Sequence, residues 1–135
     1  MIHNKKYSVV AIGNAMLDLI CEVPEQFLNE EGISKGAMNL VSMERSNNIL
    51  KIVKPIKEIA GGSAANTIST LAKLGLKTGY IGKIADDPKG NVFKKDLIES
   101  SIFYNTEFLD KSNTEATGKC IVLITPDKER TMNTY

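Results

Sequence analysis

Residues 7–18 read YSVVAIGNAMLD, and this stretch decides how the chain can fold. Its first seven residues form a nearly continuous apolar run that contains three β-branched residues and ends in Gly13. Because apolar and polar residues do not alternate in this run, both of its faces are expected to be buried. Such a run is typical of a central strand in a parallel sheet. A polar stretch begins directly after it, at Asn14.

The clearest helix is predicted over 64–74, where small and aliphatic residues recur on one side at spacings of three and four. Ser63 is the predicted N-cap of this helix, and Gly75 lies where a left-handed residue is expected to end it. A second helix is predicted to begin at Pro88, with Asp87 as its N-cap.

Shorter elements are predicted around these two helices. The predictions are a short helix or turn at 27–32, a helix at 42–54, and strands at 19–23, 38–41, 78–84, 106–109, 119–125 and 130–135. The last two strands are expected to form a hairpin. Strands that alternate with helices predict an α/β fold with a central, mostly parallel sheet, and the additional short strands predict a second, smaller sheet.

The composition argues against several classes of protein. The chain has 135 residues, 42% of them hydrophobic, and a net charge of +1, which fits one compact domain and neither a disordered nor a nucleic-acid-binding chain. No secretory signal or membrane-spanning stretch is visible, so we expect no membrane partner and a cytoplasmic location. Cys21 and Cys120 are expected to be buried free thiols rather than catalytic ones, since the only histidine, His3, lies in a polar tail.

Residues 61–66, GGSAAN, could bind an oxygen-rich ligand. Gly61 and Gly62 let a backbone approach a ligand closely, and the first turn of the following helix, from Ser63, presents free N–H groups. Asn66 lies one turn further on, where its amide offers a donor and an acceptor. The same residues also fit a plain glycine-containing turn with an exposed Asn66, and the local pattern leaves both interpretations open.

Asn14 and Asp18 follow the predicted central strand directly. Ligands of α/β sheets bind beyond the carboxyl ends of the strands. A carboxylate can accept two hydrogen bonds from neighbouring hydroxyls, and such charge-assisted bonds are strong. The alternative is a turn residue followed by a surface aspartate.

Other nucleotide and metal motifs are missing from the sequence. It contains no Gly-x-Gly-x-x-Gly after the first strand, no phosphate-binding P-loop and no Cys/His spacing typical of zinc. Asp86 and Asp87 are better explained by helix capping than by metal binding. No metal site is therefore predicted.

Four blocks together resemble the ribokinase-like family, also called the pfkB carbohydrate kinases. VVAIGNAMLDLI resembles the family's first strand and sugar-contacting turn, and GGSAANT with LAKLG resembles its N-terminal signature. GKIADDPKG resembles the next block, with Ala85 where the family commonly has glycine, and ATGKCIVLITPDKERTMNTY resembles the lid hairpin. The spacing of Asn14 and Asp18 is most similar to adenosine kinase-type members.

The resemblance implies a partial ribokinase-like fold. Residues 1–135 would be the N-terminal part of one domain, with a core at 7–18 and 42–110 and a small β-sheet lid at 19–41 and 117–135. The family phosphorylates a primary hydroxyl of a nucleoside or sugar, so the expected partner is such a small molecule. In some relatives the lids of two subunits pair, so a homodimer through the lid also fits.

The resemblance also implies roles for individual residues. Asp18 would hold the ribose hydroxyls, with Gly62 and Asn66 on the other side of them and Asn14 nearby. A second group would face the base or sugar from the lid and pocket wall: Met16, Met38, Leu40 and Cys120. From the sequence alone, the methionines fit an ordinary core equally well.

The catalytic part of the family is not found in these residues. Neither its Gly-Ala-Gly-Asp motif, which holds the catalytic aspartate, nor its Asn-x-x-Glu magnesium segment occurs in the sequence. We therefore expect no catalytic residue in this chain, with the ATP-binding part beyond it and ATP and Mg²⁺ bound only by the full-length enzyme. A non-catalytic sugar- or nucleoside-binding module and a truncated, inactive fragment remain the alternatives.

Overall fold

The computed structural model describes residues 6–110 and 112–135, so His3 lies outside the described residues. The chain divides into two compact units. Unit 1 contains the residues up to Leu17 together with Ile59–Thr117, and unit 2 contains Asp18–Glu58 and Gly118–Tyr135. Residues 42–58, which we expected in the core, fall in unit 2. α2 (Met43–Ile52) contacts the sheet of unit 2, where Lys119 donates a hydrogen bond to Asn47 at 2.7 Å. This sheet has five strands and the parallel sheet of unit 1 has three, so the second sheet is not the smaller one that we expected.

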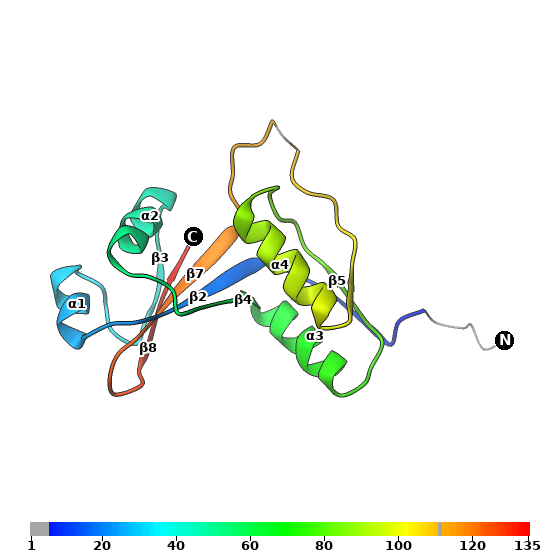
Figure 1. Ribbon diagram of the computed structural model, residues 1–135, viewed down its shortest axis with the longest axis horizontal. Helices are drawn as coiled ribbons and strands as arrows, with labels where there is room; N and C mark the ends of the chain where they lie inside the picture. The colour runs from blue at the N-terminus through cyan, green and yellow to red at the C-terminus, as the bar shows by residue number, and fades with distance from the viewer. Residues whose placement is uncertain (1–5, 111) are drawn as a thin grey trace. The chain divides into compact units, whose positions relative to one another are not determined.

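Unit 1 contains a three-stranded parallel sheet in the order β1-β5-β6. Two helices, α3 and α4, pack against the sheet (Figure 1). The bounds are β1 Val9–Ile12, α3 Ser63–Lys73, β5 Thr78–Ile81, α4 Pro88–Glu99 and β6 Ile102–Tyr104. Strands that alternate with helices thus build the predicted α/β layers.

An aromatic cluster forms the core between this sheet and its helices. Tyr80, Phe93 and Tyr104 lie with ring centroids 5.8 to 6.1 Å apart, and all three are buried. Each tyrosine hydroxyl donates to a backbone carbonyl, Tyr80 to Gly13 at 3.0 Å and Tyr104 to Gly82 at 2.7 Å. The hydroxyls are therefore satisfied inside the apolar layer, as buried polar groups must be.

The start of α3 differs from the prediction by one residue. Ser63 is the first helical residue, and the N-cap is Gly62, whose φ is 94° and ψ is 144°. A serine residue could not adopt that backbone conformation without strain, which explains why glycine occupies the N-cap. The predicted left-handed end is confirmed, since Gly75 has φ 86° and its N–H donates to Ala72 at 2.9 Å.

The start of α4 is as predicted. The Asp87 carboxylate accepts hydrogen bonds from the N–H groups of Gly90 at 2.7 Å and Thr117 at 2.8 Å, and Pro88 occupies the first turn. One aspartate therefore caps the helix and also fastens the chain that returns at Thr117.

Strand β1 is not the central, doubly buried strand that its apolar sequence predicted. Within the described residues it pairs only with β5, and Val10 and Ile12 are 52% and 78% exposed. Their side chains lie on the sheet face away from Tyr80, which α3 and α4 leave uncovered. Apolar runs report which residues favour burial, whereas the partner that buries them depends on the tertiary structure.

Unit 2 is organised around a mixed five-stranded sheet in the order β3-β8-β7-β2-β4. The elements are β2 Met16–Glu22, α1 Glu25–Glu30, β3 Met38–Leu40, α2 Met43–Ile52, β4 Lys57–Gly61, β7 Gly118–Ile124 and β8 Arg130–Thr134. The hairpin β7–β8 is antiparallel as predicted, and β3 adds to it in parallel. Both β2 and β4 cross the boundary between the two units along the chain.

Three strand predictions need correction. β4 was not predicted, and neither was β6 at 102–104. The strand predicted at 106–109 is irregular chain instead. β6 has only three residues, so its pattern is too short to distinguish from a loop, and its pairing with β5 decides its conformation.

No helix among the described residues is long and apolar enough to cross a bilayer.

Candidate functional site

The beginning of α3 lies directly against the chain that follows β1. A Cβ atom on Gly62 would lie 2.8 Å from the backbone oxygen of Asn14 and 3.5 Å from Cγ of Met16. A Cβ atom on Gly13 would lie 2.7 Å from Cβ of Ala64. Gly13 and Gly62, which are far apart in the sequence, therefore permit the close contact between the two segments. From the sequence, we had predicted only that both segments bind the same ligand.

The polar groups at this junction are available to a ligand. No side chain caps the first turn of α3, so its N–H groups have no side-chain acceptor. Asn14, Ser63 and Asn66 are exposed, and among the described residues the two amides make no side-chain hydrogen bond. Unit 1 thus brings Asn14, Gly61, Gly62, Ser63 and Asn66 to one end of α3. A helix amino terminus of this kind favours electron-rich oxygen atoms.

Asp18 belongs to unit 2 and lies within β2, not in a turn as expected. Its neighbours Leu17 and Leu19 are fully buried, so the Asp18 side chain points to the opposite face of the strand. Burial raises the pKa of Asp18 above its ordinary value. Within the described part of the chain, the carboxylate accepts no hydrogen bond and forms no ion pair. A half-buried carboxylate without a partner is unfavourable unless a ligand supplies one.

Three of the four predicted lid and pocket-wall residues, Met38, Leu40 and Cys120, share one face of the sheet in unit 2, which we call the Met38 face. The fourth, Met16, falls in unit 1. Strand pairing places Leu40, Thr134 and Cys120 in one row, and Met38, Met132 and Val122 in the next. Met38 and Leu40 are 64% and 82% exposed at the β3 edge, whereas Cys120 and Val122 are buried. The Met38 face is defined by these six residues.

Cys120 connects Asp18 to this face. Its thiol accepts a hydrogen bond from the Thr134 hydroxyl at 3.4 Å. Burial raises the pKa of Cys120, the bond from Thr134 lowers it in part, and the Asp18 carboxylate raises it again. The carboxylate and the thiol are therefore close enough for their charges to interact. Both cysteines are free and buried, as predicted.

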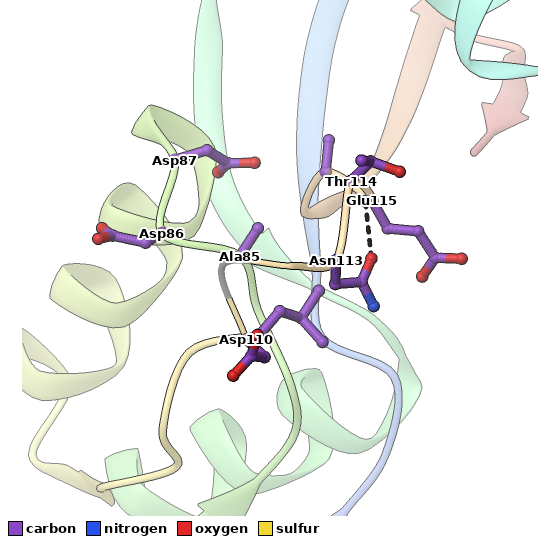
Figure 2. A pocket seen from close by; sticks show the side chains of 9 residues that line it. Ala85, Asp86, Asp87, Asp110, Asn113, Thr114 and Glu115 are labelled. Atoms are coloured by element: carbon purple, nitrogen blue, oxygen red, sulfur yellow. Dashed lines mark hydrogen bonds between the residues drawn. The ribbon is translucent and has the colours of Figure 1, made fainter.

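A cavity of about 440 Å³ in unit 1 was not predicted. Figure 2 shows three of its acidic side chains, Asp86, Asp110 and Glu115. Asp110 accepts hydrogen bonds from Ser112 at 2.6 and 2.8 Å, and Asn113 accepts one from the Glu115 N–H at 2.8 Å. In the described ranges, no three His, Cys, Asp or Glu side chains are grouped so that they could hold a metal ion. We therefore attribute these contacts to the local loop structure.

The family of the chain follows from its sequence as a whole. Residues 6–135 match the pfkB family of carbohydrate kinases. The chain belongs to this family. The fold of this pfkB-family chain also resembles solved structures. The adenosine kinase from Sinorhizobium meliloti matches 97% of this chain with a TM-score of 0.86 and 40% sequence identity. A probable sugar kinase from Rhizobium etli gives the same TM-score with 36% identity over 96%.

The names of curated relatives of this chain give another substrate than the names of these two structures. A 5-dehydro-2-deoxygluconokinase from Shouchella clausii is 27% identical over 124 residues, which are 92% of this chain. The chain spans 31% of the length of that relative and 39% of the S. meliloti and R. etli structures. The ribokinase-like fold is confirmed over this part, and kinases of the family use ATP, usually with Mg²⁺.

Proposed function

We propose that this chain is the acceptor-binding part of an ATP-dependent kinase that phosphorylates a primary hydroxyl of a nucleoside or sugar. The observation that carries the proposal is the contact between Gly62 at the start of α3 and the backbone of Asn14, within a pfkB-family chain. This contact leaves uncapped helix N–H groups beside two exposed amides, Asn14 and Asn66. Hydroxyl groups of a sugar ring match such a set of donors and acceptors.

Asp18 is proposed to hold neighbouring hydroxyls of the acceptor. Its carboxylate is half-buried and has no protein partner among the described residues, so two hydroxyl donors would compensate for its desolvation. Gly61, Gly62 and Ser63 are proposed to contribute backbone N–H groups and close approach. Asn66 is proposed to contribute its amide. The residues of unit 1 would recognise hydroxyls of a ring, and Asp18 is proposed as a separate contact from unit 2.

The Met38 face of unit 2 is proposed to contact the remainder of the acceptor, and Met16 of unit 1 is proposed as a separate contact. Met38 and Leu40 offer exposed apolar surface, and Cys120 provides a buried floor beside Thr134. Methionine adapts to ligands of different shape, because its chain is unbranched and polarizable. Names among the relatives include both a nucleoside kinase and a sugar kinase, so the acceptor class is proposed only as a ring that carries hydroxyls.

We propose no site for ATP or Mg²⁺ in the described residues. The family's Gly-Ala-Gly-Asp motif does not occur in the given sequence, and no three His, Cys, Asp or Glu side chains of the described chain are grouped so that they could hold a metal ion. We therefore derive no phosphoryl-transfer step here, and we expect no turnover by the 135-residue chain alone. A coupled ADP-release assay with adenosine or ribose checks this expectation. Turnover would assign catalytic groups to these residues and contradict the proposal.

Calorimetry of the 135-residue chain tests acceptor binding. We expect saturable binding of adenosine or ribose, and Asp18→Asn should weaken it about tenfold or more, because the amide cannot accept two charge-assisted hydrogen bonds. Glu22→Gln is the matched control, since Glu22 lies in the same strand with the same side-chain direction and is exposed. Equal affinities for the wild type and Asp18→Asn would refute the role of Asp18. No heat at millimolar ligand would refute acceptor binding by this chain.

A second candidate is a binding module that never turns its ligand over, since the uncapped N–H groups of α3 and the exposed amides beside them would bind a hydroxylated ring in either case. The two candidates differ in whether kinase activity with ATP can be restored. A kinase part should acquire activity when the remaining family segments are supplied as a second polypeptide, whereas a binding module should not.

A further inference from the structure

We propose that Met38 and Met132 form a peroxide-sensitive modification site, and that their oxidation to methionine sulfoxide weakens acceptor binding. The effect on binding rests on the proposed function, because it assumes that the Met38 face contacts the acceptor. The oxidation itself concerns only the exposure and pairing of the two side chains.

The two methionines lie side by side on neighbouring strands. Met38 of β3 is the direct partner of Met132 of β8 in a parallel pair, so both side chains point to the same face. The register is held by hydrogen bonds from the Met132 N–H to Ala37 at 2.9 Å and from the Asn39 amide to the Met132 carbonyl at 3.3 Å. β3 is an edge strand of the sheet, and Met38 is 64% exposed. Peroxide can therefore reach this pair from solvent.

The cysteines of the chain are protected from the same oxidant. Cys21 is completely buried, and burial together with the charge of Glu58 raises its pKa to about 11. Cys120 is 4% exposed, and burial raises its pKa as well. Peroxide reacts with the thiolate, which is scarce in both cases. The thioether of methionine has no such requirement, so Met38 should react before either thiol.

The reaction is a simple oxygen transfer. A lone pair of the thioether sulfur attacks one oxygen of hydrogen peroxide, an S–O bond forms and the O–O bond breaks. The departing hydroxide takes the proton of the hydroxyl now on sulfur, which leaves the sulfoxide and water. Sulfur loses two electrons and the peroxide gains them. The product is a polar, chiral sulfoxide, which methionine sulfoxide reductases convert back to the thioether.

The sulfoxide would change an apolar surface into a polar one. Met38 and Met132 lie in the row of Val122, and Leu40 belongs to the neighbouring row. An apolar part of an acceptor that packs there would meet a strong hydrogen-bond acceptor instead of a thioether. Loss of apolar contact with a ligand commonly costs about tenfold in affinity or more, so a reduction of about tenfold is expected.

Peptide mapping and calorimetry on the 135-residue chain test the proposal. After graded treatment with hydrogen peroxide, mass spectrometry should detect oxidation at Met38 first, Met132 next, and both before Cys21 and Cys120. Adenosine and ribose affinities should fall in parallel, and treatment with methionine sulfoxide reductases should restore them. Met43→Leu is the control and should keep the sensitivity of the wild type, because Met43 lies in α2. In Met16→Leu/Met38→Leu/Met132→Leu, peroxide should leave the affinity of that variant unchanged, whereas Met16→Leu alone should keep the sensitivity of the wild type.

Three outcomes would contradict the proposal. Oxidation of a cysteine before Met38 would refute the modification site. Unchanged affinity after complete oxidation of Met38 and Met132 would refute the effect on binding while leaving the proposed function intact. Failure of the untreated chain to bind any acceptor would overturn the proposed function and, with it, the effect on binding.

Discussion

The two predicted binding segments approach each other closely at Gly62, and replacing this glycine tests the geometry directly. The backbone at Gly62 has φ 94° and ψ 144°, close to a region that only glycine occupies readily. Placing a side chain there costs about 1–3 kcal/mol. In addition, a Cβ atom would lie 2.8 Å from the Asn14 backbone oxygen, which cannot rotate away as a side chain would. Together we expect Gly62→Ala to destabilise the chain by about 3 kcal/mol or more.

Gly75→Ala provides a matched control in the same unit. Gly75 also has a positive φ, 86°, but a Cβ atom there would meet nothing within 4 Å. Only the backbone penalty applies, about 1–2 kcal/mol. The two variants should therefore differ by roughly 1–2 kcal/mol, a difference that contains the contact with Asn14 and the difference between the two backbone penalties.

Urea unfolding followed by circular dichroism and tyrosine fluorescence measures this difference. With a slope of about 1–3 kcal/mol per molar urea, the midpoint of Gly62→Ala should lie about 0.3–2 M below that of Gly75→Ala. Hydrogen exchange of the α3 amides should show the same order. Equal midpoints, or a lower one for Gly75→Ala, would mean that α3 does not start against Asn14, and the proposed binding geometry would be wrong.

Three further predictions concern single side chains. Asp87→Ala removes the cap on Gly90 and should cost about 1–2 kcal/mol of unfolding free energy, measured by thermal or urea unfolding. Burial raises the pKa of Asp87, but its hydrogen bonds outweigh burial and lower the pKa below the ordinary value. The stabilisation by Asp87 is therefore complete above about pH 4 and is lost as the pH falls through the lower pKa of the folded state. Acid titrations of the wild type and the variant measure this loss. Tyr104→Phe leaves the Gly82 carbonyl without its 2.7 Å donor and should cost about 1–2 kcal/mol, with unchanged far-ultraviolet circular dichroism. Burial raises the pKa of Asp18, so its carboxylate takes up a proton at a higher pH than an ordinary aspartate does. As the pH is lowered, acceptor affinity should therefore begin to fall at this higher pH, and Asp18→Asn should remove the pH dependence.

The helix boundaries were predictable because their signals are local. Asp87 accepts from an N–H three residues away, and Gly75 ends α3 with a bond to the preceding turn. The hairpin β7–β8 belongs to the same class, since its turn and both strands are contiguous in the chain. The candidate residues around Gly62 could also be found, because glycine pairs before a helix have a recognisable sequence pattern.

Pairing between distant strands decided the rest. Only the tertiary structure places Met38 beside Met132, 94 positions away, and leaves β1 at the edge of its sheet. The strand at 102–104 and the position of Asp18 within β2 depend on neighbours that the local sequence does not name. Helix signals act within a few residues, whereas a strand is stabilised by hydrogen bonds to partners whose identity is set when the chain folds. The sequence by itself therefore determined the types of the main elements and the family, and the tertiary structure determined which side chains share a face.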